Sequence, residues 1–314
     1  MPNLLEFSWD ASSPEESEDS HPNRPPLLLL DSEVSSPHSY LLTIRHVAYQ
    51  IQWPDRILAN LKHLTVAGRA ALPLRNTVDL VTRCPSLLSL RSLHFADETI
   101  AFPSDMPTFT SSTLRTLQMD LPDQGTELGS VTWNMEFPLL EHLVVSAWPS
   151  NTRWAESSLG CTERFPSLRS AWISTHAFSA AAIMDFICAH PNLLEFGCVL
   201  SSSVAGILSV LTEPLCVAPW SLRLPRLRYL EFIRASQSLS AAPEVVEALR
   251  ALLSARGLDA NGQAILTVHI NDESFHLEQE IPCDYSELAE EFPRNVFLTH
   301  NEDLVPTRFR PELV

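Results

Sequence analysis

Glycine and cysteine are scarce in this chain, and each scarcity argues against a class of site. The 314 residues include eight glycines, and none of them forms G-x-x-x-x-G-K-[ST], G-x-G-x-x-G or G-x-S-x-G. The glycine motifs that cradle phosphate or expose a nucleophilic serine are therefore absent. The six cysteines show no C-x-x-C spacing. Their low fraction argues against a disulfide scaffold and indicates free thiols.

Long hydrophobic runs are also missing. The longest apolar stretch, 177–200, is interrupted by Asp185, His190, Pro191 and Glu195, so no transmembrane helix is expected. The N-terminus lacks the basic region of a secretory signal, and no asparagine begins an N-x-[ST] sequon. These features predict a soluble intracellular protein, cytoplasmic or nuclear, that does not bind membranes.

Basic residues are fewer than acidic ones, 21 against 38, and the net charge is −17. The acids concentrate at both ends: residues 1–40 hold eight acids and one arginine, and residues 259–314 hold twelve acids and three arginines. The negative net charge argues against binding of a nucleic acid through its phosphates. The nearly neutral stretch between the ends is typical of a folded body.

A short leucine motif recurs along the chain. Pro2-Asn-Leu-Leu-Glu-Phe7 is repeated identically as Pro191-Asn-Leu-Leu-Glu-Phe196, and looser copies follow the form P-x-L-x-x-L-x-h, where h is apolar. We place the leading leucines at Leu61, Leu90, Leu114, Leu140, Leu168, Leu193 and Leu227. Their intervals of 24 to 34 residues overlap the 20–29 residues of leucine-rich repeats. One copy, 84–95, allows two registers, starting at Leu87 or at Leu90, and we favour Leu90 because Leu93 and Phe95 then fill the apolar positions.

The spacing predicts one short strand per copy, since the last two apolar positions lie on the same face of an extended chain. Helices are expected between strands at 76–83, 179–190, 203–211 and 243–256, with Ser179 as an N-cap, and a last strand at 265–270. The predicted fold is therefore an α/β leucine-rich-repeat solenoid of about eight units. A parallel sheet lines its concave face, and helices or irregular segments form its convex face. We assign residues 1–258 to the solenoid, with an acidic Ser/Pro-rich loop at 10–40, and residues 259–314 to an acidic cap or tail.

Four stretches carry a family resemblance. Leu41–Trp53 followed by Leu58–Val66, together with the Cys-Pro-Ser-Leu at 84–87 and the Phe-Pro-Ser-Leu-Arg at 165–169, resembles the repeat region of fungal F-box/leucine-rich-repeat proteins. The resemblance covers residues 1–235 and implies substrate recognition for a cullin-type ubiquitin ligase. No F-box segment precedes these repeats, so the resemblance implies an adaptor as partner only if an F-box is supplied upstream.

The solenoid register predicts a protein-binding surface on the concave face. Aromatic residues usually dominate recognition, so we expect Trp172 and then Tyr229 to be exposed anchors, with His142 third. Trp172→Ala should then weaken binding with little loss of stability. The predicted surface comprises His63, Thr65, His94, Thr116, Gln118, His142, Val144, Ser170, Trp172, Glu195, Tyr229 and Glu231, and Ser92 and Gly197 fall on the same face.

Catalytic, cofactor and metal sites are not expected. Cys188, His190 and Cys198 lie close in sequence, but burial in the core explains the cysteines better than zinc does. We therefore predict a non-enzymatic, monomeric protein-interaction module. The alternatives are an unrecognised hydrolase-like α/β enzyme, or a degenerate repeat protein without a dedicated partner.

The acidic loop contains serines followed by acidic residues, which suit an acid-directed kinase: Ser12, Ser13 and Ser17. A solvated linker explains the same segment.

Overall fold

The computed structural model of the chain describes fourteen stretches: 5–10, 40–45, 55–67, 81–92, 109–121, 135–147, 165–175, 178–200, 204–215, 218–222, 224–234, 243–258, 261–272 and 283–300. Several predicted features lie outside them, including the acidic loop at 11–39, the helical stretch 76–80, His94 and residues 301–314. Side chains are described only from Asp55 onward, and within these later stretches not at every residue.

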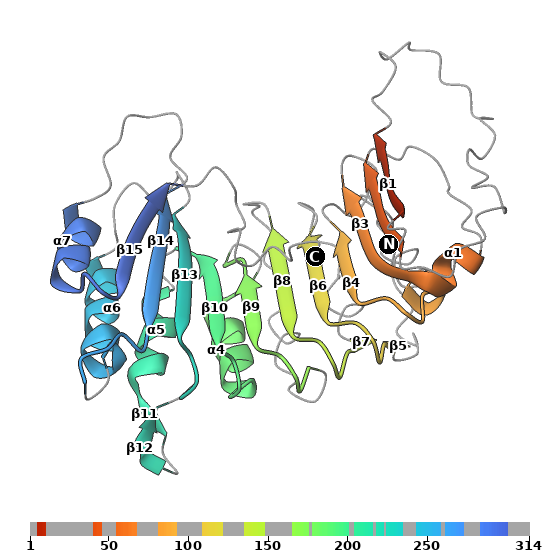
Figure 1. Ribbon diagram of the computed structural model, residues 1–314. Helices are drawn as coiled ribbons and strands as arrows, with labels where there is room; N and C mark the ends of the chain where they lie inside the picture. Colours follow the sequence, from red (N-terminus) through yellow and green to blue (C-terminus); the bar gives the residue numbers. More distant parts are fainter. Residues whose placement is uncertain are drawn as a thin grey trace.

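A single large parallel sheet organises the molecule (Figure 1). Its strands follow one another in the order in which they occur along the chain, and every neighbouring pair is parallel. The eleven strands described are β1 (Leu5–Asp10), β2 (Tyr40–Arg45), β3 (Leu61–Ala67), β4 (Ser89–Ser92), β6 (Thr116–Leu121), β8 (His142–Ala147), β9 (Ser170–Ile173), β10 (Glu195–Val199), β13 (Tyr229–Arg234), β14 (Thr267–Asp272) and β15 (Val296–His300). The α/β class and the parallel sheet are thus confirmed.

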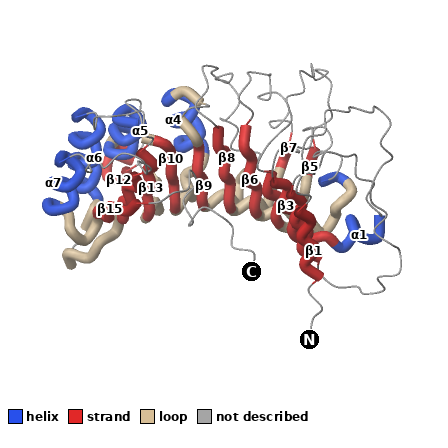
Figure 2. The backbone as a smooth tube through the Cα atoms, turned by 90° about the horizontal axis from the view of Figure 1, so that it is seen from above, coloured by secondary structure: helices blue, strands red, loops and turns tan. Residues whose placement is uncertain are grey.

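Helices cover one face of the sheet in its C-terminal half (Figures 1 and 2). We call this the outer face and the opposite one the inner face. The helices of this half are α4 (Ala180–Ala189), α5 (Val204–Thr212), α6 (Pro243–Arg256) and α7 (Cys283–Glu291), whereas α1 (Asp55–Asn60) precedes β3 in the N-terminal half. Two small two-stranded sheets accompany them, a parallel one of β5 (Phe109–Thr110) and β7 (Met135–Glu136) and an antiparallel one of β11 (Pro214–Leu215) and β12 (Ala218–Leu222).

The predicted helices at 179–190, 203–211 and 243–256 are found as α4, α5 and α6. Helix α4 begins where expected, because the hydroxyl of Ser179 accepts a hydrogen bond from the backbone N–H of Ala182 at 3.2 Å. Its apolar stripe, Ile183, Phe186 and Ile187, is buried against the sheet. Of the helix predicted at 76–83, only Val81 and Thr82 are described as helical.

One apolar core lies between the sheet and the outer layer. A tight turn positions five of the leucines that open a motif, because the backbone N–H of each donates to the carbonyl three residues earlier. These bonds join Leu87 to Cys84, Leu140 to Phe137, Leu168 to Phe165, Leu193 to His190 and Leu227 to Leu224, at 3.0–3.1 Å. A proline follows the carbonyl residue in every one of these turns, which explains the proline of the motif.

The structure corrects the register of one copy. The turn at 84–87 matches the other turns, and Leu90 pairs with Leu64 and Leu117, which are the second leucines of their motifs. Leu87 is therefore the leading residue, and the preference for Leu90 was wrong. Ser92 pairs with Val66 and Met119, two residues after Leu90, so it does not share the strand positions of Ser89 and Arg91. Ser89 and Arg91 lie on the inner face in its place.

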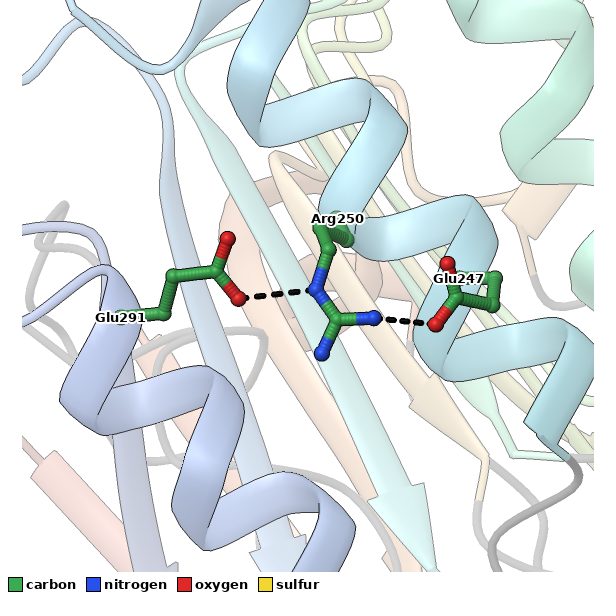
Figure 3. Close-up of polar contacts among 3 residues, drawn as sticks. All are labelled: Glu247, Arg250 and Glu291. Carbon is green, nitrogen blue, oxygen red and sulfur yellow. Dashed lines mark hydrogen bonds and ion pairs between the residues drawn. The ribbon is translucent and has the colours of Figure 1, made fainter.

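The sheet continues past the boundary predicted at 258/259. Strands β14 and β15 belong to the large sheet, and Tyr285, Leu288 and Val296 are buried in its core. The segment predicted as an acidic cap therefore supplies two strands and helix α7. Arg250 of α6 donates to Glu247 and, at 2.8 Å, to Glu291 of α7, so it links the last two helices (Figure 3). These hydrogen bonds raise the pKa of Arg250.

Candidate interaction surface

Side chains on the inner face form rows across the sheet, because neighbouring strands pair in register. The first row comprises His63, Ser89, Thr116, His142, Ser170, Glu195, Tyr229 and Thr267. The second row comprises Thr65, Arg91, Gln118, Val144, Trp172, Gly197, Glu231, His269 and Phe297. A third, shorter row holds Val199, Ile233, Asn271 and Thr299.

The rows contain eleven of the twelve residues that the sequence assigned to this surface. His94 lies outside the described residues. Sequence reasoning missed Ser89 and Arg91 through the wrong register, and it missed the contributions of β14 and β15. The residues of β14 and β15 could have been found from the alternation of residue positions at 267–272 and 296–300. Odd-numbered positions in these two strands share one face of an extended chain.

Much of the inner face is buried, which contradicts one expectation. Trp172 is only 1% exposed, and it packs with Val144, Val199, Tyr229 and Ile233 in an inner cluster separate from the main core. Gly197, the register partner of Trp172, carries no side chain and is itself buried. The prediction that Trp172 and Tyr229 are exposed anchors was wrong, because large apolar neighbours on adjacent strands cover them. Six other residues of the predicted surface are also buried, namely Thr65, Thr116, Gln118, Val144, Ser170 and Glu231.

A hydrogen-bonded network crosses the C-terminal strands of this face. The hydroxyl of Tyr229 donates to Glu231 Oε2 at 2.8 Å, and Asn271 Nδ2 donates to Glu231 Oε1. Thr299 donates in turn to the side-chain carbonyl of Asn271. Because Glu231 is 3% exposed, these donors compensate the desolvation of its carboxyl group. The network is a structural element of the sheet and not a free recognition site.

The accessible part of the inner face flanks the buried cluster. His142 is exposed, and His63, Glu195 and His269 are half-buried. Glu195 accepts a hydrogen bond from the Ser170 hydroxyl at 3.3 Å. His269 stacks between Tyr229 and Phe297, with ring centroids 5.1 Å apart on both sides, and Phe297 is 42% exposed. Burial and, secondarily, the charge of Lys62 lower the pKa of His63, which favours its neutral form.

The cysteine and histidine candidates do not converge. Cys198 is buried as expected, whereas Cys188 is exposed, so its expected burial was wrong. His190 is buried between the rings of Phe186 and Phe165, with centroids 4.3 and 6.3 Å away, and its Nδ1 lies 2.7 Å from the carbonyl oxygen of Phe186. Burial raises the pKa of the Cys198 thiol and raises that of Cys84 to about 11. Within the described stretches, no group of three or more acidic, histidine or cysteine side chains is arranged to hold a metal ion.

Comparison with known proteins adds no relative: no family model matches the chain, and no curated protein matches its sequence. None of the helices in the described part of the chain combines the length and the apolar composition needed to cross a bilayer.

Proposed function

We propose that this chain is a leucine-rich-repeat solenoid that binds another protein through the accessible part of its inner face. The observation that carries the proposal is the register: one strand per leucine motif, each paired in parallel with the next, so that equivalent side chains form rows. Such rows present a continuous surface that grows with the number of repeats, which is how stacked repeats bind extended partners. The surface combines an exposed aromatic ring at Phe297, imidazoles and a carboxylate, a mixture suited to protein recognition.

A non-catalytic role fits the same face. Its buried carboxyl group, that of Glu231, is held by Tyr229 and Asn271, so it is a satisfied structural group and lacks the exposure of a reacting one. The buried thiols carry raised pKa values, which disfavour the nucleophilic thiolate. The resemblance to F-box/leucine-rich-repeat proteins supports a finer role, substrate recognition for a cullin-type ubiquitin ligase, with the F-box supplied elsewhere.

The test is site-specific photo-crosslinking followed by affinity measurement. A photoreactive amino acid at His142 on the inner face should capture a protein in cells, whereas the same group at Asp185 on α4 should not. The captured protein is then purified and titrated against the chain and its variants.

The two variants used in the titration are Glu195→Arg and Asp185→Arg, which make the same charge change on opposite faces. We expect Glu195→Arg to weaken binding at least about tenfold, because an interfacial charge is reversed, and Asp185→Arg to leave the affinity unchanged. Equal affinities for both variants, or loss of binding only in Asp185→Arg, would contradict the inner face as the binding surface.

The ligase role has its own measurement. Co-expression with an F-box-containing protein and the cullin adaptor should yield a complex that ubiquitinates the captured protein. Glu195→Arg should reduce that ubiquitination in proportion to its lost affinity. Unchanged ubiquitination in this variant would contradict the proposal that the chain selects the substrate of the ligase.

A further inference from the structure

A row of side chains directly follows the leading leucines, at the edge of the sheet where the strands begin. In sheet order it comprises Lys62, Leu88, Arg115, Glu141, Arg169, Leu194 and Arg228. The cations therefore fall on every second strand, namely β3, β6, β9 and β13. We call this set the basic row. It borders the first row of the inner face, since His63, Thr116, Ser170 and Tyr229 are the residues that come next in the chain.

A ladder of backbone hydrogen bonds holds the basic row in register. Each N–H donates to the carbonyl of the preceding member: Leu88 to Lys62, Arg115 to Leu88, Glu141 to Arg115, Arg169 to Glu141, Leu194 to Arg169 and Arg228 to Leu194, at 2.7–2.9 Å. The Cα positions are thus fixed by the sheet and not by mobile loops. Strands lie about 4.8 Å apart, so the Cα atoms of successive cationic residues are about 9.6 Å apart.

The cations of this row are accessible. The side chains of Arg115, Arg169 and Arg228 are exposed, and that of Lys62 is half-buried. Arg115 forms an ion pair with Glu141 at 3.0 Å. Among the described residues, no ion pair involves Arg169 or Arg228. Four cations and the single acid Glu141 give the basic row itself a formal charge of about +3, in a chain whose net charge is −17.

The spacing selects one conformation of an acidic partner. A polyproline II segment has three residues per turn and rises about 3.1 Å per residue, so every third side chain projects in the same direction about 9.3 Å further along. Carboxylates at positions i, i+3, i+6 and i+9 would meet the four cations in turn. Between the cations lie the half-buried Leu88 and Leu194, which offer apolar contacts to the intervening residues.

We propose that the basic row binds an acidic, extended protein segment in the polyproline II conformation, with carboxylates three residues apart. This inference rests on the proposed function, because it names the class of partner that approaches the inner face. A peptide fits better than a nucleic acid, since the leucines between the cations match apolar side chains and the acidic chain as a whole repels long polyanions.

The probe is a labelled ten-residue peptide with glutamate at positions 1, 4, 7 and 10 and proline elsewhere, titrated against the whole chain by fluorescence anisotropy. The control peptide has the same composition with its four glutamates at positions 1, 3, 5 and 7. We expect the first peptide to bind at least about fivefold more tightly, and its affinity to fall as salt is raised. Equal affinities, no binding at low salt, or equal competition by a single-stranded oligonucleotide would overturn the proposal.

Exposed side chains of the basic row allow single substitutions that leave the fold intact. Arg169→Gln should weaken peptide binding about two- to fivefold, whereas Glu141→Gln should strengthen it by a similar factor because a repelling acid is removed. Arg250→Gln removes one positive charge from α6 on the outer face and is the matched control, with no expected change (Figure 3). Equal losses in Arg169→Gln and Arg250→Gln would show that only net charge matters and would overturn the proposal. The two proposals can be told apart. If the peptide does not bind, but the protein captured at His142 still binds and Glu195→Arg still weakens that binding, then the inference about the basic row is wrong and the proposed function is retained.

Discussion

At the scale of single residues, the inner face has two kinds of side chain: buried ones that stabilise the sheet and accessible ones that can contact a partner. Trp172 and its apolar neighbours stabilise the sheet from the side opposite to the main core. Glu231 and Asn271 extend that stabilisation through hydrogen bonds between adjacent strands. Only the side chains that flank this cluster, such as His142 and Phe297, remain accessible to a partner.

Substituting Trp172 should therefore cost stability. Trp172→Ala is expected to lower the free energy of unfolding by about 3–5 kcal/mol, and Leu168→Ala in the main core by about 2–5 kcal/mol. His142→Ala, at an exposed position of the first row, should change it by less than about 0.5 kcal/mol. Urea unfolding of the three variants measures this. A change in Trp172→Ala as small as that in His142→Ala would contradict the inner cluster.

His190 should make the protein less stable in mild acid. Burial lowers its pKa in the folded state, against a smaller opposing effect of the hydrogen bond to Phe186. As the pH falls below the unfolded value of about 6.5, the unfolded chain takes up a proton that the folded chain does not, so the free energy of unfolding decreases. His63 contributes in the same direction.

The variant for this test is His190→Phe, because Phe137 and Phe165 occupy the same place in neighbouring repeats. From about pH 7.5 to 5.5 the native chain should lose more unfolding free energy than His190→Phe, by up to about 1.4 kcal/mol over this whole range. Urea titrations at the two pH values give the difference. Identical pH dependence in both proteins would count against a buried neutral imidazole.

At the scale of elements, the repeat is held by recurring local contacts as well as by its leucines. Hydroxyls just before the leading leucine donate to a carbonyl of the previous repeat: Ser86 to Ala59, Thr113 to Pro85 and Ser167 to Pro138, at 2.6–3.2 Å. Arg256 of α6 donates to the carbonyls of Leu224 and Leu227, so it ties a helix to one of the turns. These bonds fix each turn against its neighbour.

Helix α4 offers a direct test of a local signal. Ser179→Ala removes the acceptor for the Ala182 N–H and should lower the free energy of unfolding by about 0.5–2 kcal/mol. Ser179→Asp keeps an acceptor and adds a negative charge at the helix N-terminus, so it should preserve stability. Thermal or urea unfolding of both variants is the measurement. The N-cap assignment would be wrong if the alanine and aspartate variants were equally stable.

The leucine spacing was enough to predict a parallel strand at each leucine motif and eleven of the residues that share the inner face, but not Ser89, Arg91 or the residues of β14 and β15. It could not choose between Leu87 and Leu90, because both fit the apolar pattern, and the turn bond from Leu87 to Cys84 and the pairing of Leu90 with Leu64 decide the choice. Nor could it predict that Trp172 is buried. Alternation in a strand tells which face a side chain occupies, whereas burial depends on side chains from four other positions along the chain.

At the scale of the whole molecule, the strands add one at a time in chain order, so distances across the sheet should grow in proportion to the number of repeats between two sites. The corrected leading leucines, Leu61, Leu87, Leu114, Leu140, Leu168, Leu193 and Leu227, give intervals of 25 to 28 residues up to Leu193. This even spacing supports a regular stack in that part of the chain. The basic row and the inner face both depend on that regularity.

Pulsed electron spin resonance between labels on unnatural amino acids tests the stack most directly. Labels at Lys62 and Arg169 are four strands apart, and so are labels at Arg115 and Arg228, whereas Lys62 and Arg228 are six strands apart. The account predicts backbone separations of about 19 Å for the first two pairs and about 29 Å for the third. Unequal distances in the first two pairs, or a third distance no longer than theirs, would contradict the stacked, in-register repeats.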